Sequence, residues 1–205
     1  MSYKASLVTS EFYSQNRIFK IKDPILNRDN IIYVPWYLKS ILSKKGILLA
    51  TADIHKPKDS DIIIYLDIPK KLPDTDEIKK SFLILQEVAA VMPKNWDFKK
   101  HNYFAKVFTF CDDLIDNKKY FKLNSCRPFN KKVPIDISKK NKFCAMISGN
   151  KVSKHPLELY TKRLEAVNWF AEYYPNDLDF YGIGWDQKIF RSRPQNFPIL
   201  RPSRL

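Results

Sequence analysis

The residue best suited to acid–base chemistry is Glu87. It closely follows Phe82–Leu85, an apolar run typical of a buried strand. Ligand clefts of open parallel sheets form beyond the carboxyl ends of the strands, so a carboxylate in this place can accept a proton from a bound hydroxyl group. A surface glutamate that caps the next segment is the alternative. We therefore treat Glu87 as a candidate general base.

A turn and a histidine follow the candidate base. Pro93-Lys-Asn-Trp96 has turn chemistry, because Pro93 fixes its own φ and Asn95 can hydrogen-bond to its own backbone. This group is either a structural turn or, together with His101, the polar lining of a ligand pocket beside Glu87. In the second case Trp96 offers an aromatic face on which a ligand ring can stack.

A second group, Ser148-Gly-Asn-Lys151, is expected between a strand and a helix. Backbone N–H groups and a helix N-terminus in such a place can bind a diphosphate. Arg163, further along the expected helix, adds a permanent cation that can pair bidentately with a pyrophosphate. The segment matches neither the P-loop nor the dinucleotide-binding fingerprint, and a helix-surface arginine is the equal alternative.

The sequence shows no pattern for a metal site. The histidines, His55, His101 and His155, are scattered, and the three cysteines are too few and too far apart for a zinc site or a disulfide framework. Asp112-Asp113 is better explained as the N-cap and acidic first turn of a helix. We expect no metal, no cofactor and a reducing compartment.

Apolar runs alternate with amphipathic stretches along the chain, a pattern typical of βα units in a parallel sheet. These elements must position the candidate groups. Strands are expected at residues 5–8, 47–50, 61–66, 82–85, 106–110, 143–147 and 178–181, and helices or helical turns at 36–45, 75–80, 99–103 and 157–173. The sequence therefore predicts an α/β protein. We divide it into a domain at 1–130, a linker at 131–141, the start of a second domain at 142–186 and an irregular basic tail at 187–205.

Charge narrows the class of partner. The 205 residues carry a formal net charge of +14, which favours nucleic acid, a phospholipid surface or a phosphorylated small molecule. Most lysines are spread along the chain in pairs and are expected on a solvated surface. No stretch approaches the roughly 18 uninterrupted apolar residues of a spanning helix. We expect a cytoplasmic protein and leave open a peripheral contact with the inner face of an anionic membrane.

Two stretches resemble the bacterial members of glycosyltransferase family 10, the α-1,3-fucosyltransferase family. Residues 83–114 have a strand and glutamate, then Pro-x-Asn, a histidine and phenylalanine, and Val-Phe-Thr, in the order of that family's acceptor domain. Phe143-Cys-Ala-Met-Ile-Ser-Gly-Asn-Lys151, Tyr160-Thr-Lys-Arg163 and Tyr181-Gly182 are similar to the first βαβ unit of its donor domain. Order and spacing, not one short motif, carry the resemblance.

The resemblance implies a GT-B-like arrangement, with one Rossmann-like parallel-sheet domain complete and only the first βαβ unit of a second. It also implies inverting, metal-independent transfer of a sugar, namely fucose from GDP-fucose, to a glycan or glycolipid acceptor such as lipopolysaccharide or a surface saccharide. By the same resemblance the catalytic base is Glu87, the acceptor-binding residues are Asn95, Trp96 and His101, and the donor-binding residues are Ser148, Asn150, Lys151 and Arg163.

One departure keeps two alternatives open. The family's later donor-binding pattern, a strand with Phe-Glu-Asn followed by Thr-Glu-Lys, does not occur in these residues. The chain is therefore either an incomplete transferase or an inactive, truncated remnant. A basic nucleic-acid-binding α/β module is the other alternative. Its aromatic residues, however, fall inside apolar strands and helices and not on a polar face, so no nucleic-acid partner is expected.

Overall fold

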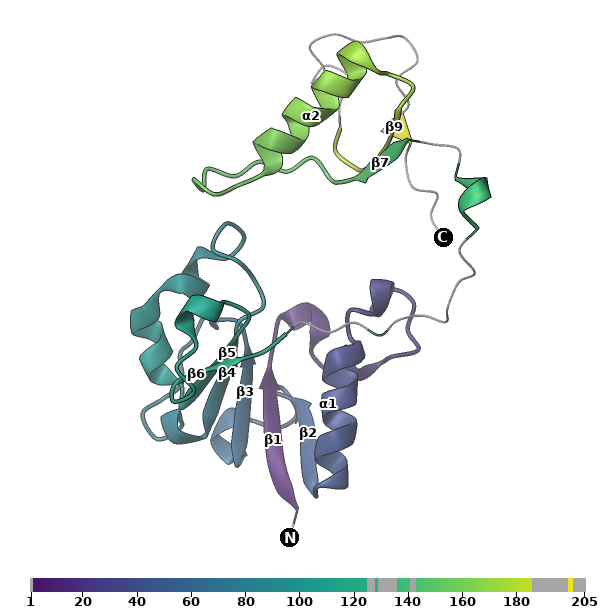
Figure 1. Cartoon of the computed structure of the whole chain (residues 1–205). Coiled ribbons are helices and arrows are strands. Elements are labelled where there is room, and N and C mark those ends of the chain that lie inside the picture. The colour runs from purple at the N-terminus through teal and green to yellow at the C-terminus, as the bar shows by residue number, and fades with distance from the viewer. Residues whose placement is uncertain (1, 125–127, 129–135, 141–142, 186–198, 201–205) are drawn as a thin grey trace. The chain divides into compact units, whose positions relative to one another are not determined.

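The computed structural model describes residues 2–124, 128, 136–140, 143–185 and 199–200. The chain divides into two compact units, Met1–Lys132 and Val133–Leu205 (Figure 1). Most of the predicted linker at 131–141 and of the predicted tail at 187–205 lies outside the described residues.

A six-stranded parallel sheet forms the first unit. In spatial order its strands are β2 (Ile47–Thr51), β1 (Tyr3–Val8), β3 (Ile62–Leu66), β4 (Ser81–Ile84), β5 (Lys106–Thr109) and β6 (Tyr120–Lys122). The chain steps outward from β1 to β2 and then crosses back to β3, so the topological switch point lies between β1 and β3. Beside it, β3 and β4 pair in parallel up to Leu66 and Ile84, which places the segments after these two strands next to each other.

Successive side chains of β3 point into two different cores, because side chains alternate between the faces of a sheet. Ile62 and Ile64 pack on the face that is covered by α1 (Tyr33–Lys44). Ile63 and Tyr65 pack on the other face, in a cluster that includes Phe104. This two-sided burial explains why β3 is a continuous apolar run and not an alternating one.

The two faces are covered by different kinds of connection (Figure 1). Helix α1 begins three residues earlier than predicted, and after its end Gly46 has a φ of +75°, as the sequence indicated. The opposite face carries short 3₁₀ turns, among them η5 (Ile78–Lys80), η6 (Pro93–Trp96) and η7 (Phe98–Tyr103). The remaining 3₁₀ turns are η1 (Glu11–Tyr13), η2 (Arg17–Phe19), η3 (Arg28–Asn30), η4 (Pro57–Asp59), η8 (Asp112–Leu114) and η9 (Ile137–Lys139).

Two helical predictions are corrected by these turns. The helix expected at 75–80 is only the turn η5, since so short a segment gains too few hydrogen bonds to offset the cost of nucleating a helix. The turn at Asp112-Asp113 has Cys111, and not Asp112, at its N-cap.

A βαβ unit forms the described part of the second unit. It contains β7 (Cys144–Ile147), α2 (Tyr160–Tyr173) and β8 (Leu178–Tyr181), and β9 (Ile199–Leu200) adds a third parallel strand. Val167 and Ala171 of α2 pack on the buried Leu178 and Phe180 of β8. Helix α2 begins three residues later than predicted, and β9 lies inside the range that was predicted to be irregular.

The fold is therefore α/β, with a parallel sheet compatible with a Rossmann-like domain. In the part of the chain that the structure describes, no helix has the length and apolar character needed to cross a membrane.

Candidate functional site

Among the residues that the structure describes, only side chains form hydrogen bonds with the backbone of Glu87. Its N–H points to Oδ1 of Asp67 at 3.4 Å, and its carbonyl oxygen accepts from Nδ2 of Asn95 at 3.4 Å and from Nε1 of Trp96 at 3.2 Å. The residue is half-buried. Its carboxylate makes no hydrogen bond or ion pair with any residue that the structure describes. The main chain of Glu87 is thus fixed while its acidic group is left available.

Asp67 is the centre of this arrangement. It directly follows β3 in the left-handed conformation, with a φ of +62°, which aspartate adopts more readily than most residues. Its own N–H donates to the carbonyl of Ile84 at 2.9 Å. Its Oδ1 accepts from the N–H of Gln86 at 2.7 Å and from Nδ2 of Asn95 at 2.6 Å, in addition to Glu87. The sequence interpretation missed Asp67, although its signal was present: an acidic residue directly after the most apolar strand.

Asn95 is fully buried and joins the segments that follow β3 and β4. Its Oδ1 accepts from the N–H of Ile68 at 2.9 Å, while its Nδ2 donates to Asp67. Both ends of the amide are therefore engaged within the protein. In this structure the side chain has no exposed surface with which to make the acceptor contact that was predicted for it.

His101 is also fully buried. Its Nε2 lies 2.8 Å from the carbonyl oxygen of Asn95, which can only accept, so Nε2 carries the proton. Burial lowers the pKa of His101, and the nearby Lys119 cation lowers it further, against the opposing effects of the Asn95 carbonyl and Asp97. The ring is therefore neutral near pH 7, and its Nε2–H group holds the backbone carbonyl of Asn95.

Trp96, in contrast to the fully buried ring of His101, remains half-buried. Its indole N–H is used by Glu87, and its ring meets Phe110 edge to face with centroids 6.2 Å apart. The structure thus brings together Glu87, Asn95, Trp96 and His101, with Trp96 and Glu87 as the members that keep some exposed surface.

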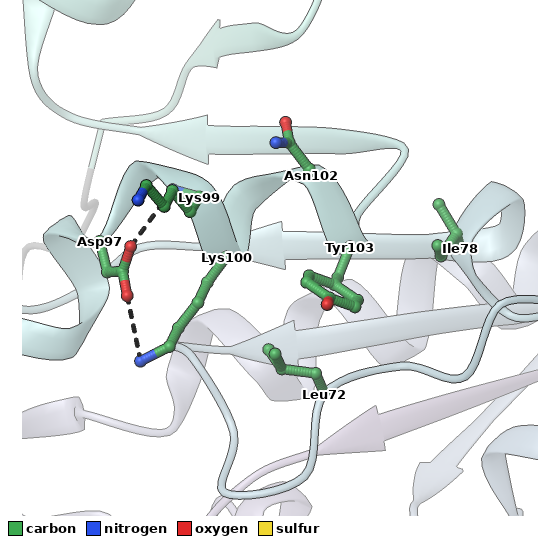
Figure 2. Close-up of a pocket in the computed structure, with 7 residues that line it drawn as sticks. All are labelled: Leu72, Ile78, Asp97, Lys99, Lys100, Asn102 and Tyr103. Atoms are coloured by element: carbon green, nitrogen blue, oxygen red, sulfur yellow. Dashed lines mark hydrogen bonds and ion pairs between the residues drawn. The ribbon is translucent and has the colours of Figure 1, made fainter.

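A separate pocket of about 550 Å³ lies between the β3–β4 and β4–β5 connections (Figure 2). It is lined by Leu72, Ile78, Asp97, Lys99, Lys100, Asn102 and Tyr103. Asp97 accepts from the N–H of Lys99 and forms an ion pair with Lys100 at 3.3 Å, so part of the polar lining is already engaged. None of the predicted site residues lines this pocket.

In the second unit, the Ser148–Lys151 loop lies between β7 and α2 and is fastened to the turn after β8. Nε1 of Trp185 donates to the carbonyl of Ser148 at 2.7 Å, and Nδ2 of Asn150 donates to the carbonyl of Gly184 at 3.0 Å. A Cβ atom on Gly182 would lie 1.9 Å from the Ser148 carbonyl oxygen. Glycine is therefore required where the two loops approach each other.

The N-terminus of α2 differs from the arrangement predicted for a diphosphate site. The helix starts at Tyr160, well beyond Lys151, and its first N–H groups, those of Tyr160 and Thr161, donate to the carboxylate of Glu158. An acidic side chain of the protein itself therefore occupies the place of an external anion.

Arg163 and Ser148 are brought together in the second unit. Nη1 of Arg163 donates to Oγ of Ser148 at 3.4 Å, and the guanidinium carbon lies 5.1 Å from the centre of the Tyr160 ring. Arg163 and Lys151 are both exposed. Of the predicted donor-binding residues, these two cations, and not the helix N-terminus, are the charged groups that an anionic ligand can reach.

Metal coordination has no counterpart in the described residues, where no three His, Cys, Asp or Glu side chains are placed to hold an ion. Cys111 and Cys144 are free thiols, both half-buried.

No protein-family model matches the chain, and no curated protein matches it at a significant level.

Proposed function

We propose that this chain belongs to an inverting glycosyltransferase with a GT-B-like arrangement that resembles glycosyltransferase family 10. Its donor would be GDP-fucose and its acceptor a hydroxyl group of a glycan. The supporting observation is Glu87, whose backbone is fixed by three neighbouring side chains while its carboxylate is left without a partner among the described residues. Glu87 lies beyond the carboxyl end of β4, and ligands of parallel sheets usually bind beyond the carboxyl ends of the strands.

Glu87 is the general base of this proposal. Its carboxylate accepts the proton of the acceptor hydroxyl as that oxygen attacks the anomeric carbon of the donor. The bond from the anomeric carbon to the diphosphate oxygen breaks, GDP leaves with the bonding electrons, and the configuration at carbon inverts. The step needs no redox partner.

The other predicted residues take different parts in this proposal. Trp96 is the acceptor-binding residue that retains exposed surface, whereas the buried Asn95 and His101 act by holding the Glu87 segment. In the second unit, Arg163 and Lys151 contact the diphosphate of the donor, because a guanidinium and an ammonium group stabilise the charge of a leaving phosphate. Ser148 and Asn150 shape the loop beside them.

The net charge of +14 fits an anionic donor and an acceptor at an anionic membrane surface. A glycolipid or lipopolysaccharide acceptor at the cytoplasmic face of a membrane is therefore part of the proposal.

The test is transfer from GDP-fucose to a panel of oligosaccharides, measured both as released GDP and as fucosylated product by mass spectrometry. The wild-type protein, at the full length of any longer chain that contains these 205 residues, should form product, and Glu87→Gln should reduce kcat by about 10²-fold or more, the contribution typical of a general base. Glu87→Gln should also bind GDP as tightly as the wild type, because the base acts on the acceptor. The proposal fails if the wild type neither forms product nor binds GDP.

A further inference from the structure

We infer that Asp67 is the positioning residue for Glu87, which it orients without touching the substrate. This inference rests on the proposed function, since it assigns a role in setting the geometry of the same site.

The main chain of Glu87 lies outside the regular secondary structure, between β4 and η6. Glu87 stands three positions beyond the end of β4, and in the described residues its N–H and carbonyl groups bond only to side chains. The nearest backbone turn bonds start at Val88, whose carbonyl accepts from the N–H groups of Val91 and Met92. Helical or sheet hydrogen bonds therefore do not fix the main chain at Glu87.

Asp67 supplies the missing restraint from the neighbouring strand. One carboxylate oxygen receives Gln86 N–H at 2.7 Å, Glu87 N–H at 3.4 Å and Asn95 Nδ2 at 2.6 Å. Hydrogen bonds to a charged acceptor are stronger than those between neutral groups. The same oxygen thus holds the backbone before the base and also the amide that binds the carbonyl of the base.

The backbone conformation of Asp67 places its carboxylate beside the segment that follows β4. Its φ of +62° turns the chain directly after β3, while its N–H remains paired with Ile84, the last residue of β4. The carboxylate is consequently anchored to the very strand whose following segment it holds. A displacement of a catalytic group by about 1 Å can cost about 10²-fold in rate, so the loss of this anchor should reduce kcat more than substrate binding.

The experiment compares Asp67 with Asp23, an aspartate in another part of the fold whose carboxylate also accepts two backbone N–H groups. Asp23 accepts the N–H groups of Ile25 and Leu26 with one carboxylate oxygen, at 2.9 and 3.0 Å, and Leu26 packs in the core on the α1 side of the sheet. Asp67→Gly and Asp23→Gly each remove a carboxylate that holds two backbone N–H groups. Glycine at position 67 tolerates the positive φ, so the first variant adds no strain.

Transfer is measured with GDP-fucose and the acceptor for each variant, corrected for the folded fraction from urea unfolding. Asp67→Gly should lower kcat by about 10- to 100-fold with a much smaller change in KM, and Asp67→Asn should restore most of the rate because it keeps an acceptor oxygen. Asp23→Gly should retain kcat within about twofold, although it is also destabilised. Equal kcat values for Asp67→Gly and Asp23→Gly would overturn the inference and leave Asp67 a structural residue.

A second readout separates this inference from the proposed function. Amide hydrogen exchange of Gln86 and Glu87, followed by NMR, should accelerate in Asp67→Gly and stay unchanged in Asp23→Gly. If the wild type shows neither transfer nor GDP binding, the proposed function fails, and this exchange result still decides the role of Asp67. Unchanged protection of both amides in Asp67→Gly would refute it.

Discussion

The imidazole of His101 lies between a backbone carbonyl and the hydroxyl group of Tyr120, with Nδ1 and the phenolic oxygen 3.0 Å apart. Because Nε2 donates to Asn95, Nδ1 of the neutral ring must accept, and the hydroxyl of Tyr120 donates. Burial raises the pKa of Tyr120, which keeps the hydroxyl protonated for this role. A hydrogen-bonded chain thus links Tyr120 of β6 through His101 and Asn95 to Asp67.

The first prediction concerns the protonation of His101. Its pKa in the folded protein lies below the ordinary value of 6.5, so the unfolded chain binds a proton more readily than the folded one. The stability that this difference provides is present above pH 6.5 and is lost as the pH falls below that value. The free energy of unfolding in urea should therefore decrease between pH 7 and pH 5, and less steeply in His101→Gln.

His155→Gln is the control for this measurement, since it removes a histidine from the second unit and leaves His101 in place. It should keep the wild-type decrease. A decrease of the same steepness in His101→Gln would show that other groups cause it.

Sequence patterns were sufficient for most of the strands and for the position of Glu87 after β4. Burial on both faces selects the apolar run of β3, and a positive φ selects the glycine after α1. Each requirement is visible in one short segment of the sequence. Strand β6 was not predicted, because it has three residues, none of them fully buried, and is flanked by lysines and polar residues. Its apolar pattern was too short to recognise.

The partners of Glu87 could not be predicted in the same way. Asp67 and Asn95 are separated by 28 positions and meet only because β3 and β4 are neighbours in the sheet. The residue types at Asn95 and His101 suggested ligand contacts, yet the fold buries both and uses their polar atoms for internal bonds. Strand order decides such pairings, and a single sequence does not reveal it.

The second prediction tests the bond between Asp67 and Asn95. Asn95→Asp replaces the amide donor with a carboxylate about 2.6 Å from Oδ1 of Asp67, and two carboxylates this close cannot both ionise without a large cost. The folded state must then either keep a proton shared by the pair or hold two like charges together, so the stability of the variant should fall as the pH increases. Asn95→Asp should therefore be less stable at pH 8 than at pH 6, opposite to the trend of the wild type.

Asn95→Ala is the matched control for that charge effect. It loses the hydrogen bonds of a buried amide, which costs about 1–3 kcal/mol, but introduces no carboxylate. At pH 8, the melting temperature of Asn95→Asp should be lower than that of Asn95→Ala. Equal stabilities of the two variants at that pH would mean that Asp67 does not face position 95 as an ionised carboxylate.

The third prediction addresses donor binding through Arg163. A guanidinium that bonds a phosphate contributes about 1.5–3 kcal/mol, so Arg163→Ala should weaken GDP binding by about tenfold or more in isothermal titration calorimetry. Lys162→Ala is the matched control, because it removes an exposed cation from the adjacent position, where Lys162 already pairs with Glu165 at 2.7 Å. It should change the affinity by less than about threefold, as expected for a screened surface charge. Equal losses in the two variants would indicate that GDP responds to the overall positive charge of α2 and not to a site at Arg163 and Ser148.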